Sequence, residues 1–339
     1  MCVTITEYVF NTIPKNIYVV SKYKISVGGR LSLCKAVLGG LGGYYFSLFK
    51  APSNVIKDLE RKRRNFLWGS SNEHRKTAWV TWDKVLNSRE KGGFGIGSLR
   101  AHNIALLAKW WWRFKTEEKA LWRQVIVAFY GRSGRLGEEN GGLSKRGAWG
   151  SIATVDRGRR RLMEGGSNDP HKLLKARRLA TLWNKLIPLK VRVRNWLARL
   201  DRLPTKFNLG KRGIRLDNDQ CVFCNEDIET SDHIFLSCRR SIEVRRAVNS
   251  WWDLLPLQSF SMQNFYDDGK GDRVLSRRKI KEVAAQAYIW ALWNGRNEAI
   301  FNNKVLDPLR MTNDIKSHMF NWCKARDDRF RLLNWNIWC

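Results

Sequence analysis

Residues 221–238 read CVFCNEDIETSDHIFLSC, and this stretch decides how the second half of the chain folds. Cys221, Cys224, His233 and Cys238 follow the spacing C-x2-C-x8-H-x4-C. The first two cysteines can hold an ion in a tight turn, and the histidine and the last cysteine can close a tetrahedron around it. Zn²⁺ takes four such sulfur and nitrogen ligands, and a complete set leaves no open coordination position. The spacing therefore predicts one structural zinc ion that holds a fold and does not activate water.

The alternative is that these four side chains lie near one another in the sequence without binding a metal. Short clusters of cysteine and histidine usually mark metal sites, so we favour the zinc interpretation.

The composition is that of a strongly basic protein with enough apolar residues for a sizeable core. The chain has 339 residues, of which 43% are hydrophobic, and this length suits two or three domains. Its 62 Lys and Arg against 31 Asp and Glu give a formal charge of +31. Such an excess attracts polyanions, so we expect RNA or DNA as partner, while protein partners stay unknown.

Two features bear on the cellular location. The apolar run over residues 36–49 is interrupted by four glycines and is too short to span a bilayer, so we expect no membrane association. The first residues lack the basic segment and apolar core of a secretory signal. The remaining cysteines are scattered and do not suggest a disulfide framework, which favours a nuclear or cytoplasmic location over secretion. These cysteines are Cys2, Cys34, Cys323 and Cys339.

Helical spacing of apolar residues dominates the chain and predicts a mainly α fold. Pro52 and Gly69 bound one expected helix, as a proline at the start and a glycine after the end usually do. Residues 77–85 fit either a short strand or a turn followed by a helix, and residues 254–271 read as a loop. The other expected helices cover residues 98–115, 119–130, 239–252, 276–300 and 311–334.

Two further motifs have a functional and a structural interpretation. GGFGIG at residues 92–97 lacks the Lys-Ser/Thr ending of a phosphate-binding P-loop, so a plain turn is favoured. The triplet Trp110, Trp111 and Trp112 could stack on bases, but a role in the core is favoured.

A basic arm leads into the predicted zinc segment. Residues 157–215 hold 18 Lys and Arg and three acidic residues, with apolar residues between them. The zinc segment itself is acidic, so any grip on phosphate should lie in the arm. The alternative is a solvated basic face without a specific partner, but neutralised phosphates add up along an arm. The candidate phosphate-binding residues are Lys190, Arg192, Arg194, Arg199, Lys211 and Arg212.

Several long segments of the sequence resemble the C-terminal part of the reverse transcriptase encoded by plant non-LTR (LINE-type) retroelements. They occur in family order, with a gap over the region around residues 131–169. The segments are SVGGRLSLCKAVL, YYFSLFKAP, RRNFLWG, WVTWDKV, GGFGIGSLRAHNIALLAKWWWRF, LWRQVI, LWNKLIPLKVRVRNWLARLDRLPTKFNLGKRGI with CVFC and DHIFLSC, and IWALWNGRNEAIF.

The resemblance implies a domain order for this chain. Residues 1–21 are unassigned, and residues 22–130 correspond to a thumb-like and connecting helical bundle. Residues 131–169 are rich in Gly, Ser and charge, and this composition by itself predicts a flexible linker. After it, the resemblance implies a helical zinc-binding domain at 170–255 with a small CCHC knuckle. Residues 256–339 form a helical extension. The family's zinc ligands carry over onto Cys221, Cys224, His233 and Cys238.

The resemblance also implies a polymerase palm upstream, whose aromatic-x-Asp-Asp motif binds catalytic metal ions. No such motif precedes residue 22, and FYDD at residues 265–268 lacks the surrounding strands, so we expect no catalysis. We expect a retroelement-derived chain that binds one structural Zn²⁺ and RNA or DNA. The alternatives are a protein-interaction module, a remnant without function, and a truncated RNA-directed DNA polymerase.

Overall fold

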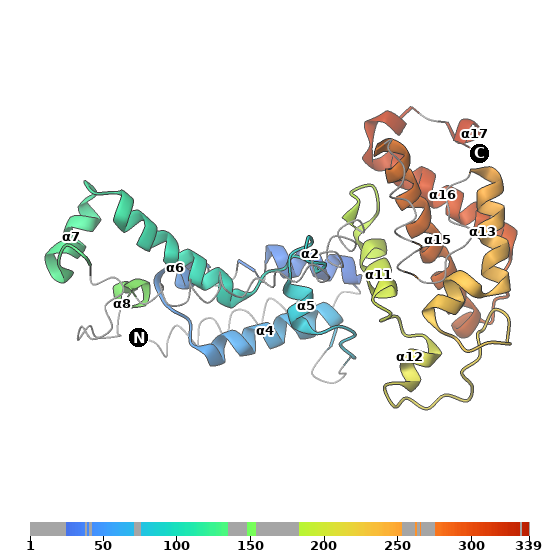
Figure 1. Cartoon of the computed structure of the whole chain (residues 1–339), viewed down its shortest axis with the longest axis horizontal. Coiled ribbons are helices and arrows are strands. Elements are labelled where there is room, and N and C mark those ends of the chain that lie inside the picture. The colour runs from blue at the N-terminus through green and yellow to red at the C-terminus, as the bar shows by residue number, and fades with distance from the viewer. Residues whose placement is uncertain are drawn as a thin grey trace. The chain divides into compact units, whose positions relative to one another are not determined.

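The computed structural model describes residues 25–37, 39–40, 43–70, 76–134, 148–153, 183–252, 262, 265, 275–332 and 334–338. The chain divides into two compact units, unit 1 at residues 1–174 and unit 2 at residues 175–339. The predicted mainly α fold is confirmed: the described residues form helices and contain one isolated antiparallel bridge, between Gln220 and Ile228. Figure 1 colours unit 1 from blue to green and unit 2 from yellow-green to red.

Unit 1 is a bundle of helices in which α2 packs on α4, and α6 packs on α3 and α8. No helix that the structure describes, in either unit, combines the length and apolar character that a bilayer crossing needs. The helices of unit 1 are α2 (Val27–Ala36), α3 (Gly43–Leu48), α4 (Ser53–Trp68), α5 (Trp82–Leu86), α6 (Leu99–Thr116), α7 (Leu121–Tyr130) and α8 (Ala148–Ala153).

The first half of unit 1 follows the sequence signals closely. α4 begins after Pro52 and ends at Gly69, which adopts the left-handed conformation (φ 73°) that glycine reaches without strain. Residues 77–85 form no strand: an irregular segment with a bend at Val80 leads into α5. The buried Asn103 of α6 holds α3 in place, because its amide donates to the carbonyl oxygens of Phe46 and Phe49.

The second half of unit 1 has an aromatic core. Leu107 and Phe114 of α6 are buried together with Trp149 and Ile152 of α8. Trp149 lies 5.0 Å from the Phe114 ring and donates its indole N–H to a backbone carbonyl. The short helix α8 falls within residues 131–169, whose glycine-rich composition suggested a linker, while residues 135–147 and 154–169 lie outside the described parts.

The tryptophan triplet divides between core and surface. Trp110 and Trp111 pack against the aromatic core, as expected, but Trp112 is 61% exposed. Consecutive helical residues point about 100° apart, so three in a row cannot all face one core.

Unit 2 is built around the long helix α15, which packs on α11, α16 and η2, while α13 packs on α16 and η2. At Gly295 of α15 an added Cβ would lie 2.5 Å from Cε of Met311 on α16, so the flexible end of the Met311 side chain packs directly on the glycine. The elements of unit 2 are α11 (Leu189–Arg199), α12 (Lys206–Gly210), η2 (His233–Ser237), α13 (Arg239–Trp251), α15 (Leu275–Asn302), α16 (Pro308–Arg326), η4 (Asp328–Phe330) and α17 (Trp335–Trp338).

Two expectations for unit 2 are wrong. The last helix was expected to reach residue 334, but α16 ends at Arg326 because the Asp327 carboxylate accepts the Arg329 backbone N–H and starts the new turn η4. Residues 254–271 were expected as a loop; of these residues the structure describes Met262 and Phe265, and both are helical and buried. Phe265 is 2% exposed because its ring packs 5.7 Å from that of Tyr288.

Candidate metal site

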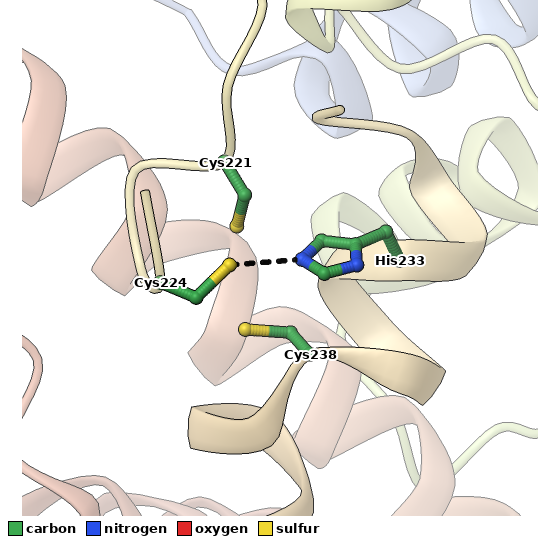
Figure 2. Close-up of side chains that lie close together, drawn as sticks. All are labelled: Cys221, Cys224, His233 and Cys238. Carbon is green, nitrogen blue, oxygen red and sulfur yellow. Dashed lines mark hydrogen bonds between the residues drawn. The ribbon is translucent and has the colours of Figure 1, made fainter. Parts of the chain in front are cut away.

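The four residues of the predicted zinc site come together in unit 2. All four side chains are buried, and their ligand atoms lie within 4.8 Å of one another. Figure 2 shows the three sulfur atoms and the Nε2 atom of His233 pointing into one common space. Around a zinc ion with bonds of about 2.0 to 2.3 Å, tetrahedral ligand atoms lie about 3.3 to 3.8 Å apart. The donor set of three thiols and one imidazole therefore fits one structural Zn²⁺, as the sequence predicted.

The first pair of ligands lies in a tight turn. The Asn225 N–H donates to the Cys221 carbonyl oxygen at 2.8 Å, and Asn225 takes the left-handed conformation (φ 56°) that asparagine tolerates. The backbone N–H groups of Phe223 and Cys224 point toward the Cys221 sulfur. The turn thus supplies two positive N–H dipoles to a sulfur that must carry negative charge when a metal is bound.

The second pair of ligands lies on one side of a widened helical turn, η2. The Cys238 N–H donates to the His233 carbonyl oxygen at 2.8 Å, five residues back, which is the hydrogen bond of a π-helix. In an α-helix two residues five apart would point about 140° away from each other. The wider turn reduces this angle and explains how the spacing H-x4-C brings both ligands to one ion. Thr230 starts the turn by accepting the His233 N–H on its hydroxyl.

Cys238 also forms the N-cap of α13. The backbone N–H groups of Arg240 and Ser241 face its sulfur, where the positive end of the helix dipole favours a thiolate. A hydrogen bond from the Cys221 thiol is the largest cause that lowers the pKa of Cys238, to about 5. The same hydrogen bond, followed by burial, raises the pKa of Cys221. The two sulfurs thus share a proton, which a bound metal ion would replace.

A buried ion pair fastens the metal turn to α15. Glu229, between the two ligand pairs, is 0% exposed and accepts from Arg296 of α15, with a shortest distance of 2.6 Å. Its carboxylate also accepts the backbone N–H of Lys206 at the start of α12. Arg296 stacks on the ring of Trp293, at 4.9 Å. Sequence analysis missed this pair, although Arg296 lies within IWALWNGRNEAIF, one of the segments that resemble the family.

The structure separates the predicted phosphate-binding residues into two groups. Arg199 is 6% exposed and Arg194 is half-buried between the rings of Trp290 and Trp293 of α15, so these two help to pack α11. Lys190, Lys211 and Arg212 are exposed, and Arg192 is half-buried beside Trp183. The exposed Lys190 lies 5.5 Å from the same Trp290 ring.

The exposed basic residues around α12 form a surface that we call the α12 patch. Burial, and then the positive charge of Arg202, lower the pKa of Arg212. Lys211 lies 4.1 Å from the ring of Phe207, which is 36% exposed. The patch consists of the exposed cations Arg202, Lys211, Arg212 and Arg215, the exposed ring of Phe207, and the half-buried Lys206.

Comparisons with known proteins agree with this site. A family model described as zinc-binding in reverse transcriptase matches residues 169–244, which include all four ligands. An uncharacterized mitochondrial protein of Arabidopsis thaliana is 32% identical over 110 residues, which are 32% of this chain and 71% of that protein. The chain belongs to the reverse-transcriptase zinc-binding family.

A second relative of this zinc-binding family member is an Arabidopsis thaliana protein named for ribonuclease H. It is 34% identical over 129 residues, or 38% of this chain. The chain spans only 20% of that relative's length, so the relative's activity is not transferred to it. No solved structure matches the chain. The expected reverse-transcriptase zinc-binding domain, with its one structural zinc ion, is confirmed by the family match and the ligand cluster together.

Proposed function

We propose that this zinc-binding family member is a non-catalytic nucleic-acid-binding protein whose α12 patch grips the phosphate backbone. The observation that carries the proposal is the cluster of exposed cations around α12, namely Arg202, Lys211, Arg212 and Arg215, because clustered positive charge on a surface attracts the phosphates of a polyanion. The exposed ring of Phe207, with Lys211 beside it, offers a surface on which an unpaired base can stack.

The position of the patch supports the proposal. The Lys206 N–H donates to Glu229, and the Phe207 N–H donates to the Glu229 carbonyl oxygen, so α12 is joined to the metal turn. A structural zinc ion would therefore hold the patch in place without touching the nucleic acid. Lys190, beside Trp290 on α11, is a second candidate contact, whereas the buried Arg199 is not.

The test is fluorescence anisotropy with labelled single-stranded RNA and duplex DNA over a range of salt concentrations. We expect affinity to fall steeply with salt, because bound phosphates release counterions. In Lys211→Ala/Arg212→Ala, the slope of log affinity against log salt should shrink by about 1.4 to 1.8, for two lost phosphate contacts.

The matched control is Lys57→Ala/Arg64→Ala, which removes the same charge from the exposed face of α4 in unit 1. This variant should keep both the affinity and the slope. An equal loss in both variants would show that bulk charge binds nucleic acid and would overturn the assignment to the α12 patch.

The non-catalytic part of the proposal is tested separately. Asp267 and Asp268 of FYDD lie outside the described residues, but the buried Phe265 packs on Tyr288 in the zinc-bearing unit. We expect no magnesium-dependent nucleotide incorporation by the purified chain. Incorporation that is lost in Asp267→Asn would instead support a truncated polymerase.

A protein-interaction role is a second candidate, favoured by one feature of unit 1. Helix α7 exposes Leu121, Val125 and Phe129 at 79%, 54% and 78%, and these positions lie four residues apart on one helix face. A defined partner that stays bound after nuclease treatment and is lost in Val125→Asp would support this role over nucleic-acid binding.

A further inference from the structure

The histidine ligand has a second interaction that nothing above explains. His233 directs Nε2 toward the cluster, 3.3 Å from the Cys224 sulfur, and directs Nδ1 away from it. On that outer side lie the Ser237 hydroxyl at 3.3 Å and the Asp227 carboxylate at 3.4 Å. Both residues are exposed, so their side chains are not placed there by packing alone.

A metal-bound histidine must be neutral and must leave its ligand nitrogen without a proton. When Nε2 is the ligand atom, the single ring proton therefore has to sit on Nδ1. A serine hydroxyl can donate or accept and is compatible with either tautomer. An ionised carboxylate only accepts, so Asp227 selects the form that carries the proton on Nδ1.

The backbone of Asp227 connects this contact to the first ligand. Its carbonyl oxygen accepts the N–H of Cys221 at 2.7 Å, so the residue lies at a fixed place in the metal turn. Asp227 thus contacts two ligands. Its backbone binds the Cys221 N–H, and its side chain lies beside the His233 ring. We infer that Asp227 is a positioning residue for zinc, which sets the tautomer and orientation of His233 and strengthens Nε2 as a ligand.

The neighbouring Glu226 provides a matched control. It is also an exposed carboxylate in the same turn, but its partner is Arg239, at 3.1 Å, and not a ligand. Glu226→Gln and Asp227→Asn each remove one negative charge from the same turn, at neighbouring positions. A difference between them cannot come from the general attraction of negative charge for a cation.

The experiment measures the zinc dissociation constant of the full chain by competition with a chromophoric chelator. Asp227→Ala should weaken zinc binding about 10- to 100-fold, as expected when the partner of a ligating histidine is lost. Asp227→Asn should show a smaller loss, because its amide oxygen can still accept the proton. Glu226→Gln should stay within about threefold of the original chain, as for other exposed charges.

A second measurement separates positioning from general stability. Nitrogen NMR of the zinc-loaded chain, labelled in histidine, should show the Nδ1-protonated tautomer of His233 in the original chain. In Asp227→Ala/Ser237→Ala the proton should stay on Nδ1, but the Nδ1 signal should shift or broaden, because the N–H then lacks the side chains that face it. Equal zinc affinities for Asp227→Asn, Asp227→Ala and Glu226→Gln, or an unchanged His233 signal, would overturn the inference. Neither result depends on nucleic-acid binding, so the proposed function is tested independently.

Discussion

The two units reach a stable core by different means. In unit 1 the described core is apolar and aromatic, and its buried polar side chains are Arg63 and Asn103. In unit 2 many polar and charged side chains are buried between the helices and the metal turn. They are Asn195, Arg199, Thr205, Asn208, Glu229, Ser231, His233, Ser241, Arg245, Gln286, Arg296 and Thr312.

The difference teaches where each unit is sensitive to change. An apolar core tolerates substitutions that keep its volume, because dispersion and burial have little directional preference. A buried polar network tolerates few changes, because each lost partner leaves a group without its hydrogen bond. We therefore expect a perturbation in unit 2 to spread through the whole unit, and one in unit 1 to stay local.

Removal of zinc should give the largest effect and should separate the two units. Structural zinc contributes on the order of 10 kcal/mol to small zinc-binding folds, so a chelator or Cys221→Ser should unfold much of unit 2. Hydrogen exchange followed by mass spectrometry should show lost protection in α11, α13 and α15 but not in α4 or α6.

The control for zinc removal is Cys34→Ser, which places the same substitution at a buried cysteine of unit 1. This variant should bind one zinc ion per chain, and the amides of unit 2 should stay fully protected from hydrogen exchange. If Cys221→Ser retained zinc and protection, unit 2 would not depend on the metal and the contrast between the units would disappear.

Breaking the ion pair between Glu229 and Arg296 should have the next largest effect. Glu229→Gln leaves a buried guanidinium without its counter-charge, so we expect the zinc-loaded unit 2 to lose about 3 to 5 kcal/mol of unfolding free energy in urea. The exposed pair between Glu226 and Arg239 should contribute at most about 1 kcal/mol in the same measurement.

The double variant Glu229→Gln/Arg296→Met sharpens this comparison. It removes the charge that the single variant leaves unpaired, so much of the lost stability should return. A double variant that is as unstable as Glu229→Gln alone would show that the carboxylate matters for its bond to Lys206 and not for the ion pair.

The smallest effect should be a dependence on pH at His318 of α16. Burial is the largest cause that lowers its pKa from 6.5, with the Lys190 charge acting in the same direction and Asp314 opposing them. As the pH falls below about 6.5, the unfolded chain takes up a proton before the folded chain does, so the unfolding free energy decreases. Stability is therefore retained above this pH and lost below it.

The measurement compares urea midpoints of the original chain and His318→Gln at several pH values between about 7.5 and 5.5. The zinc ligands respond to acid in both proteins, so only the difference between them reports on His318. The variant should lose less stability on acidification, and identical pH profiles would contradict this assignment.

Local sequence signals predicted the metal ligands and most helices. The four ligands lie within one stretch of eighteen residues, so a single spacing pattern carries them. The boundaries of α4 depend on Pro52 and Gly69, whose backbone preferences act without tertiary contacts. Helix α16 ended earlier than predicted, because Asp327 redirects the chain where the apolar spacing alone continues.

The features that sequence analysis missed depend on contacts between distant residues. Glu229 and Arg296 are 67 positions apart, and no local pattern indicates that they meet. Arg199 was predicted to bind phosphate because it lies in a basic run, yet the packing of α11 buries it. The π-helical turn at His233 brings two ligands five residues apart to one side, and nothing in its composition indicates it.

Arg296 lies 67 positions after Glu229 in the sequence, and this separation matters when the protein is shortened. The family match ends at residue 244, and a version cut there would keep all four ligands but lose α15. Glu229 would then lie beside the metal turn without its guanidinium, and the backbone carbonyl oxygens of Phe235 and Ser241 would lose the Tyr288 hydroxyl. We therefore expect the smallest version that folds alone to extend past residue 244 and to include α15.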